Sequence, residues 1–135
     1  MILKESELNL VCDKIKSRLP NGGVVILQGD LASGKTTLVK SFVDSFGIKD
    51  VVTSPTFSLQ QCYGGSIYHY DIYNHGLEHF ISLGMLEELD KSGYHLVEWG
   101  DDSLIDILKS AMIDVIKVEI KKCESDKRCY KVSDE

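Results

Sequence analysis

The stretch Leu27 to Lys40 reads LQGDLASGKTTLVK, and its glycine spacing decides the fold class. Gly29, Gly34, Lys35 and Thr36 match the pattern GxxxxGK[ST], in which a glycine-rich loop connects a strand to a helix. The backbone N–H groups of such a loop surround phosphate groups, and the helix N-terminus adds positive potential. The lysine reaches the outer phosphates and the threonine hydroxyl holds Mg²⁺. The stretch therefore predicts a phosphate-binding loop for a nucleoside triphosphate.

The flanks of this loop supply the strand and the helix that the pattern requires. Residues 24–28, VVILQ, form a continuous apolar run, which is typical of a strand buried on both faces. Residues 35–46 predict a helix that Gly47 closes. Its inner side should carry four apolar residues: Leu38, Phe42, Val43 and Phe46.

The remaining sequence predicts elements of both types. Helices are expected over 5–19, with Ser6 as the candidate N-cap, over 76–90 with a break at Gly84, and over 101–111. Strands are expected in a 57–73 hairpin turning at Gly64 and Gly65, over 94–99, and in a second hairpin of 115–123 with 127–132.

Length and pattern together define the fold class. At 135 residues the chain is long enough for one compact core and short for two. We expect an α/β protein: a single P-loop NTPase-like domain over residues 1–135, with a mixed, partly parallel central sheet flanked by helices.

Charge is distributed unevenly along the chain. Residues 1–49 carry seven basic and five acidic groups, residues 50–114 carry two and eleven, and residues 115–135 carry six and five. The acidic middle should repel phosphate backbones, which excludes a broad nucleic-acid-binding face there and favours a protein partner or simple solubility. The sequence has neither a long apolar run nor a secretory signal pattern at its start, so we expect a cytoplasmic protein with no membrane association.

Cysteine and histidine spacings do not indicate a metal site. The four cysteines match neither a CxxC metal pattern nor a redox pair and are predicted to be thiols: Cys12, Cys62, Cys123 and Cys129. His75 and His79 are spaced for one helix face, but HGLEH differs from the HExxH pattern.

Two carboxylates follow predicted strands and are candidates for holding Mg²⁺. Asp71 ends SIYHYD and Glu98 ends YHLVE, the position that carboxylates of phosphate-loop proteins occupy. A solvated acid at a strand end is the alternative for either one. Between the loop and these acids lies VVTSPTFSL, residues 51–59, in which Thr53, Ser54 and Thr56 either form a switch segment facing a γ-phosphate or an ordinary turn.

Two absences bear on the chemistry. No NKxD-type segment for reading guanine is present, and the residues from Asp71 to Asn74 lack the glycine of a DxxG switch, so ATP is favoured over GTP. The only arginines are Arg18 and Arg128, and neither lies in a lid-like insertion. Because phosphoryl-transfer sites use arginine to stabilise transition-state charge, we expect a weak ATPase that a partner completes.

Four motifs in order, GDLASGKTTLVK, TSPTFSL, HYDIYN and LVEWG, resemble the TsaE family, bacterial P-loop ATPases of tRNA threonylcarbamoyladenosine biosynthesis. The resemblance runs from Leu27 to Gly100. It implies a Mg²⁺-dependent ATPase that acts as an accessory subunit of the TsaD and TsaB proteins. Those proteins modify the adenosine next to the anticodon, so tRNA would be reached only through the complex.

The same resemblance implies roles for individual residues. Lys35, Asp71 and Glu98 would be catalytic, and Thr36, Asp71 and Glu98 would hold Mg²⁺. The remaining nucleotide contacts would come from the loop, the switch segment and a tryptophan beside the site: Gly29, Asp30, Leu31, Ala32, Ser33, Gly34, Lys35, Thr36, Thr37, Thr53, Thr56 and Trp99.

The chain also departs from the family pattern at four positions. Ala32 and Ser33 replace the usual Gly and Ala, and Ala32 should adopt a negative φ. Asn74 replaces a common Arg, and Gly100 replaces a frequent Pro.

Two other functions stay open from the residues alone. A small-molecule P-loop kinase would use Asp71 as the base for an acceptor hydroxyl. An ATP-dependent binding module without significant hydrolysis would use ATP only to order Thr53 to Thr56.

Overall fold

The computed structural model describes residues 1–30, 33–52, 60–73, 76–124 and 126–134. The helices are η1 (Glu5–Glu7), α1 (Asn9–Arg18), α2 (Lys35–Asp44), α3 (Gly76–Ser82), α4 (Met85–Leu89) and α5 (Asp102–Ser110). The strands are β1 (Ile2–Lys4), β2 (Gly22–Gln28), β3 (Gln60–Tyr63), β4 (Ile67–Asp71), β5 (Gly93–Glu98), β6 (Val115–Glu124) and β7 (Lys127–Asp134).

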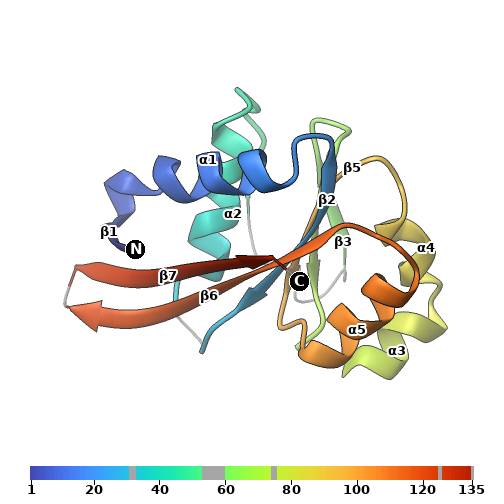
Figure 1. Cartoon of the computed structure of the whole chain (residues 1–135). Helices are drawn as coiled ribbons and strands as arrows, with labels where there is room; N and C mark the ends of the chain where they lie inside the picture. Colours follow the sequence, from blue (N-terminus) through green and yellow to red (C-terminus); the bar gives the residue numbers. More distant parts are fainter. Residues whose placement is uncertain (31–32, 53–59, 74–75, 125, 135) are drawn as a thin grey trace.

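The strands form one seven-stranded sheet in the order β1-β7-β6-β2-β5-β4-β3 (Figure 1). The central strand β2 pairs in parallel with β5 and β6, and β4 pairs in parallel with β5. At the two ends of the sheet the pairing is antiparallel: β7 with β6, β1 with β7, and β3 with β4. The predicted α/β class with a mixed, partly parallel sheet is confirmed.

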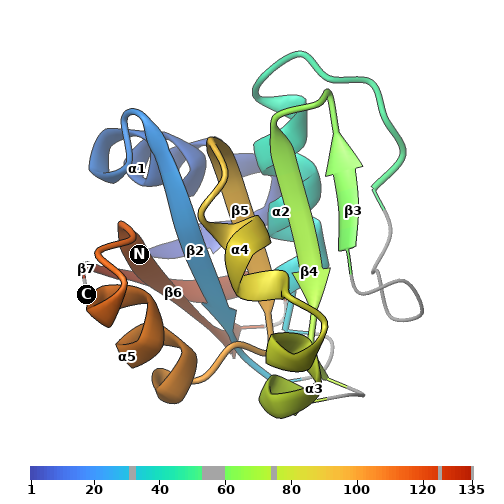
Figure 2. The ribbon, with the colours of Figure 1, turned by 90° about the vertical axis from the view of Figure 1, so that its right-hand side faces the viewer.

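Helices cover both faces of the sheet. The pair α1 and α2 lies behind the sheet in the view of Figure 2, and α3, α4 and α5 lie in front of it. Strand β2 is buried on both faces, which explains the apolar run from Val24 to Leu27. Val25 and Leu27 belong to the core on the α1 and α2 side, and Val24 and Ile26 belong to the core on the other side. Within the described residues, no helix combines the length and the apolar character needed to cross a membrane.

Two details of the predicted helices are wrong. The 5–19 segment divides into η1 and α1, and α1 has Leu8 at its N-cap with no side-chain cap, so Ser6 is not the cap. Helix α2 ends at Asp44, and Phe46 is 43% exposed because it lies beyond the last helical turn. The Phe46 ring still contacts Phe42, with ring centroids 5.2 Å apart.

The predicted break and the predicted turns are confirmed. Gly84 separates α3 from α4 and adopts φ 75°, a conformation that glycine favours. The turn of the first hairpin contains Gly64 and Gly65, between β3 and β4. The second hairpin joins β6 to β7.

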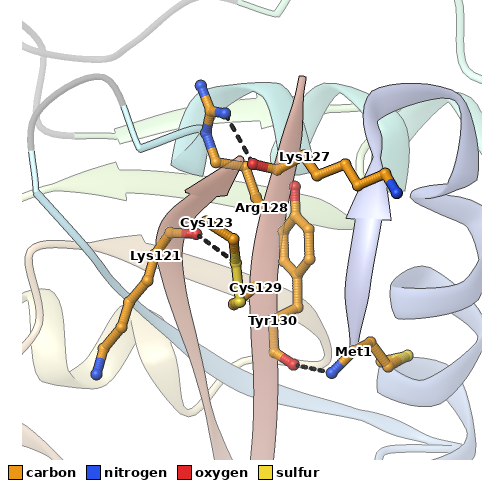
Figure 3. Close-up of a disulfide and its surroundings, with 7 residues drawn as sticks. All are labelled: Met1, Lys121, Cys123, Lys127, Arg128, Cys129 and Tyr130. Atoms are coloured by element: carbon orange, nitrogen blue, oxygen red, sulfur yellow. Dashed lines mark hydrogen bonds between the residues drawn. A yellow bond between two sulfur atoms is a disulfide. The ribbon is translucent and has the colours of Figure 1, made fainter. Parts of the chain in front are cut away.

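The prediction of four thiols is wrong for two of the cysteines. Cys123 and Cys129 form a disulfide across the β6–β7 hairpin, with Cα atoms 5.9 Å apart (Figure 3). The register of the hairpin shifts between Lys122 and Glu124, so Cys123 leaves the regular ladder beside its partner strand. Cys12, which is buried, and Cys62, which is exposed, are free thiols.

Candidate nucleotide-binding site

The predicted phosphate loop connects β2 to the N-terminus of α2. A Cβ at Gly29 would lie 2.5 Å from Ser33 Oγ and 2.7 Å from the Ile120 carbonyl oxygen, so this position has no room for a side chain. Gly34 is the N-cap of α2 and has φ 110°, in the left-handed region that favours glycine. Both glycines of the motif are therefore required by the local geometry.

Lys35 lies inside this loop. The side chain is 5% exposed, and its Nζ donates hydrogen bonds to the carbonyl oxygens of Gly29 at 2.6 Å and Asp30 at 2.9 Å. Burial lowers the pKa of the Lys35 ammonium, and the carboxylates of Glu98 and Asp71 oppose that shift. The lysine is thus held against the loop backbone at the N-terminal end of α2.

Thr36 faces Glu98, the last residue of β5. The Thr36 hydroxyl donates to the Glu98 carboxylate, at 2.9 Å from Oε2 and 3.2 Å from Oε1. Glu98 is 3% exposed, so it is not a solvated acid at a strand end. The loop helix and the neighbouring parallel strand therefore place a hydroxyl and a carboxylate in direct contact.

Asp71 lies beside Glu98 at the same edge of the sheet. It ends β4, it is paired with Glu98 in the strand register, and it is 5% exposed. Its Oδ1 accepts a hydrogen bond from the Tyr73 backbone N–H at 2.9 Å. The structure thus brings Thr36, Asp71 and Glu98, the three predicted Mg²⁺ ligands, to one edge.

The Trp99 ring lies against the Lys35 ammonium group, which also contacts the loop carbonyls. Lys35 Nζ lies 3.9 Å from the centroid of the Trp99 ring, and the centroids of the Tyr73 and Trp99 rings are 4.6 Å apart. Trp99 adopts φ 67°, which is uncommon for a bulky residue, and its backbone N–H donates to the Leu27 carbonyl oxygen at 3.3 Å. This backbone conformation turns the chain directly after Glu98, where functional sites commonly hold strained residues.

Sequence reasoning missed His69. Its side chain is 0% exposed, and its Nε2 lies 2.5 Å from Glu98 Oε2. A signal for it was present: side chains alternate along a strand, so His69 and Asp71, both on β4, point to the same face. Predicting Asp71 at the site therefore places His69 next to it.

Two clefts flank the loop. One, of about 410 Å³, lies between the loop and β6 and is lined by Gln28, Gly29, Asp30, Ser33, Glu119, Ile120, Lys121 and Lys122. The other, of about 470 Å³, lies toward the N-terminal segment and β7, and Gly34, Thr37 and Arg128 contribute to its lining. Ser33 lines both clefts, and its buried hydroxyl has no hydrogen-bond partner within the described residues.

Several predicted residues lie outside the described residues. They are Leu31 and Ala32 of the loop, Thr53, Ser54 and Thr56 of the switch segment, and Asn74 and His75. The predicted φ of Ala32 and the alternatives for the switch segment stay predictions.

The donor set at the edge of the sheet suits Mg²⁺ bound together with phosphates. Thr36, Asp71 and Glu98 offer only oxygen atoms, which Mg²⁺ prefers, and Mg²⁺ in nucleotide sites takes its other ligands from water and phosphate. Among the residues that the structure describes, no group of three His, Cys, Asp or Glu side chains is arranged to hold a metal by itself. The residues present therefore fit a metal that arrives with a nucleotide.

Comparison with known proteins adds an independent line of argument. The family model described as "Threonylcarbamoyl adenosine biosynthesis protein TsaE" matches residues 2–130. Two proteins called tRNA threonylcarbamoyladenosine biosynthesis protein TsaE are similar to this chain. That of Treponema pallidum is 43% identical over 86 residues, covering 62% of this chain and 64% of the relative. That of Rickettsia bellii is 31% identical over 137 residues, covering 97% and 91%.

The share of the relatives that is matched varies. The aligned region spans 64% of the Treponema pallidum protein and 51% of the Bacillus subtilis TsaE protein, which is 41% identical over 81 residues, or 58% of this chain. Among solved structures, Bacillus subtilis YdiB superposes with a TM-score of 0.67 at 26% identity, covering 100% of this chain and 87% of that chain. Together with the loop, the Thr36–Glu98 contact and the sheet order, these matches show that the chain belongs to the TsaE family.

Proposed function

We propose that this protein is an ATP-binding and ATP-hydrolysing accessory subunit for threonylcarbamoyladenosine modification of tRNA next to the anticodon. The observation that carries the proposal is the contact between Thr36, at the start of the loop helix, and the buried Glu98 carboxylate. This contact joins a phosphate loop to a carboxylate, which supports the binding of a nucleoside triphosphate together with Mg²⁺. The pathway comes from the family to which the chain belongs.

Each residue of the site has a role in this proposal. The loop N–H groups and Lys35 bind the phosphates of ATP, and Lys35 exchanges the carbonyls of Gly29 and Asp30 for phosphate oxygens. Thr36, Asp71 and Glu98 hold Mg²⁺, which neutralises phosphate charge when bound. Glu98 and Asp71 are the carboxylates available to orient the attacking water, and Trp99 lies beside the nucleotide.

The positions of the arginines support dependence on a partner. Arg18 forms an ion pair with Asp134, and Arg128, on β7, lines the cleft that also contains Gly34 and Thr37 and donates to the Lys127 carbonyl. Arg18 is thus held away from the loop, and Arg128 is not hydrogen-bonded to Thr36 or Glu98, so we propose that a partner adds positive charge at the Thr36–Glu98 edge. We propose the TsaD and TsaB proteins as partners, tRNA as a contact only through them, and the cytoplasm as the compartment.

We further propose that residues 1–135 act as a single domain. Strand β1, near the start of the chain, pairs with β7, near its end, in the same sheet that carries the site. The site and the β1–β7 pair therefore belong to one continuous sheet.

Lys35→Ala tests the proposal, with Lys40→Ala as the matched control. Both lysines are on α2, but Lys40 is exposed and Lys35 is buried in the loop. We expect Lys35→Ala to remain folded and to lose both ATP binding and tRNA modification, measured by equilibrium dialysis and by mass spectrometry of tRNA nucleosides from a complemented strain. Lys40→Ala should retain both.

The outcomes separate the alternatives. Normal tRNA modification in the Lys35→Ala strain would overturn the proposal. Loss of ATP that requires an added metabolite acceptor would indicate a kinase. Binding of ATP with no turnover, even after addition of TsaD and TsaB, would indicate a binding module.

A further inference from the structure

We propose that His69 is a positioning residue that holds the Glu98 carboxylate in its orientation toward Thr36. The inference rests on the proposed function, because it concerns how a residue with no access to the nucleotide supports Glu98. His69 would act only through Glu98.

The geometry at Glu98 carries the first step. Glu98 is 3% exposed and His69 is 0% exposed, with Nε2 and Oε2 2.5 Å apart. A buried carboxylate without a donor costs several kcal/mol, so its orientation follows the donors that surround it. Thr36 supplies a donor from the loop helix and His69 supplies one from the sheet, so the carboxylate is held from two sides.

The second step is that the His69 ring is itself held. Its Nδ1 lies 3.4 Å from the Tyr63 hydroxyl oxygen on the neighbouring strand β3, and the Tyr63 hydroxyl donates to Gln61. Contacts at both ring nitrogens fix the plane of the imidazole and direct Nε2 at Glu98.

The strand register makes the arrangement rigid. His69 pairs with Leu96 and Asp71 pairs with Glu98, so His69 and Glu98 are diagonal neighbours on one face of two parallel strands. Both side chains thus stand on regular, hydrogen-bonded backbone. Such a pair holds a carboxylate more precisely than a loop residue would.

The chain offers a matched control in His95. It is also 0% exposed and lies on β5, but it contacts Tyr70 Oη at 2.7 Å and the Lys91 carbonyl at 2.8 Å, and it stacks on Tyr68. Tyr68 and Tyr70 alternate with His69 along β4, so His95 lies on the opposite face of the sheet. Replacing it removes a buried histidine without touching Glu98.

The experiment compares His69→Leu, His69→Gln and His95→Leu. Turnover of ATP is measured in the full chain, and Mg²⁺-dependent ATP binding is followed by the fluorescence of Trp99, the only tryptophan.

We expect His69→Leu to lower kcat by about 10-fold to 100-fold and to raise the Mg²⁺ concentration at which ATP binding is half-maximal, as loss of an outer hydrogen-bond partner does. His69→Gln keeps a donor at the same reach and should stay within about threefold of the unmodified protein. His95→Leu should lower the unfolding midpoint and leave kcat and the Mg²⁺ dependence unchanged at a temperature where it is folded.

A double-mutant cycle of His69→Leu with Glu98→Gln tests whether His69 acts through Glu98. In a Glu98→Gln background, His69→Leu should cause no further change in the Mg²⁺ dependence of Trp99 fluorescence, because the group that His69 orients is already altered. If His69→Leu does not fold, His69→Asn replaces it, since its shorter amide keeps polarity but does not reach Oε2.

Three results would overturn the inference: unchanged kcat in His69→Leu, equal losses in His69→Gln and His69→Leu, or additive effects in the Glu98→Gln background. If the unmodified protein neither binds nor hydrolyses ATP, the proposed function fails instead, and the two failures are distinguished.

Discussion

At Gly29 the loop packs too closely on its neighbours to accept a side chain. Adding one methyl group there would place carbon 2.5 Å from Ser33 Oγ and 2.7 Å from the Ile120 carbonyl oxygen. Gly29→Ala should therefore displace the loop and lower ATP affinity by about 5-fold to 150-fold, since steric overlap in a packed site costs about 1–3 kcal/mol. Equilibrium dialysis with ATP and Mg²⁺ measures the effect.

Two further variants locate the cause of that effect. Gly65→Ala lies in the β3–β4 turn, where an added Cβ meets nothing within 4 Å but φ is 76°, so it should lower stability and leave ATP affinity unchanged. Gly29→Ala combined with Ser33→Ala should not recover affinity, because the Ile120 contact is to backbone. Recovery in that double variant would show that the Ser33 side chain alone, and not the packing of the loop on β6, sets the requirement for glycine.

His95 gives the protein a pH-dependent stability that is separate from the site. Burial lowers the pKa of His95 below its ordinary value of 6.5, and the Lys91 carbonyl partly opposes this shift. The unfolded chain therefore binds the proton more readily, so this stability is present above pH 6.5 and is lost as the pH falls. His95→Gln should show a smaller drop in the free energy of unfolding between pH 8 and pH 5 than the unmodified protein, measured by urea titration. His79→Gln, at an exposed position, serves as control, and an identical pH dependence in His95→Gln would contradict the assignment.

At the scale of elements, the β6–β7 hairpin carries a covalent link. Cys123 and Cys129 are six residues apart, so the disulfide closes a short loop and should add about 2 kcal/mol to the free energy of unfolding by the chain-entropy estimate. Reductant should lower the unfolding midpoint of the unmodified protein. The variant with Cys123→Ser and Cys129→Ser, which retains the thiols of Cys12 and Cys62, should be insensitive to reductant. Equal sensitivity of both proteins would contradict the disulfide.

Elements with strong local patterns could be predicted from the sequence. The apolar run before the loop, the two hairpin turns and the break at Gly84 each follow from residues within a few positions of one another. Strand β1 was not predicted, because its three residues gain a partner only from β7 at the far end of the chain. The disulfide could not be predicted from cysteine spacing for a related reason: it depends on the pairing of β6 with β7, which brings Cys123 beside Cys129.

The site follows the same division. The loop residues and the two carboxylates were found because each is tied to a motif or to a strand end. His69 required the alternation of β4 to be combined with the pairing of β4 and β5, which is a tertiary fact. The exposure of Phe46 likewise depends on where α2 ends, and helix ends are less well determined by periodicity than helix interiors.

At the scale of the whole molecule, the exposed acidic residues predict that the isolated protein does not bind tRNA. Exposed acids occupy the side of the sheet covered by α3, α4 and α5, including Glu78, Glu87 and Asp106. We expect no retention of tRNA by the isolated protein in filter-binding assays at physiological salt, because like charges repel. The variant with Glu78→Lys, Glu87→Lys and Asp106→Lys should bind tRNA, and added salt should abolish this binding. Salt-sensitive retention of tRNA by the unmodified protein would contradict the prediction.

The sheet order also sets the sequence of events during synthesis. Strand β2, which leads into the phosphate loop, has no partner until β5 and β6 have been made, and β1 pairs only with β7. Strand β1 is therefore made long before the strand with which it pairs. Glu98 and His69 likewise come together only when β4 and β5 pair. A chain arrested before residue 93 would carry the complete loop motif without the strand that places Glu98 against it, so nucleotide binding during synthesis should begin only after β5 has emerged.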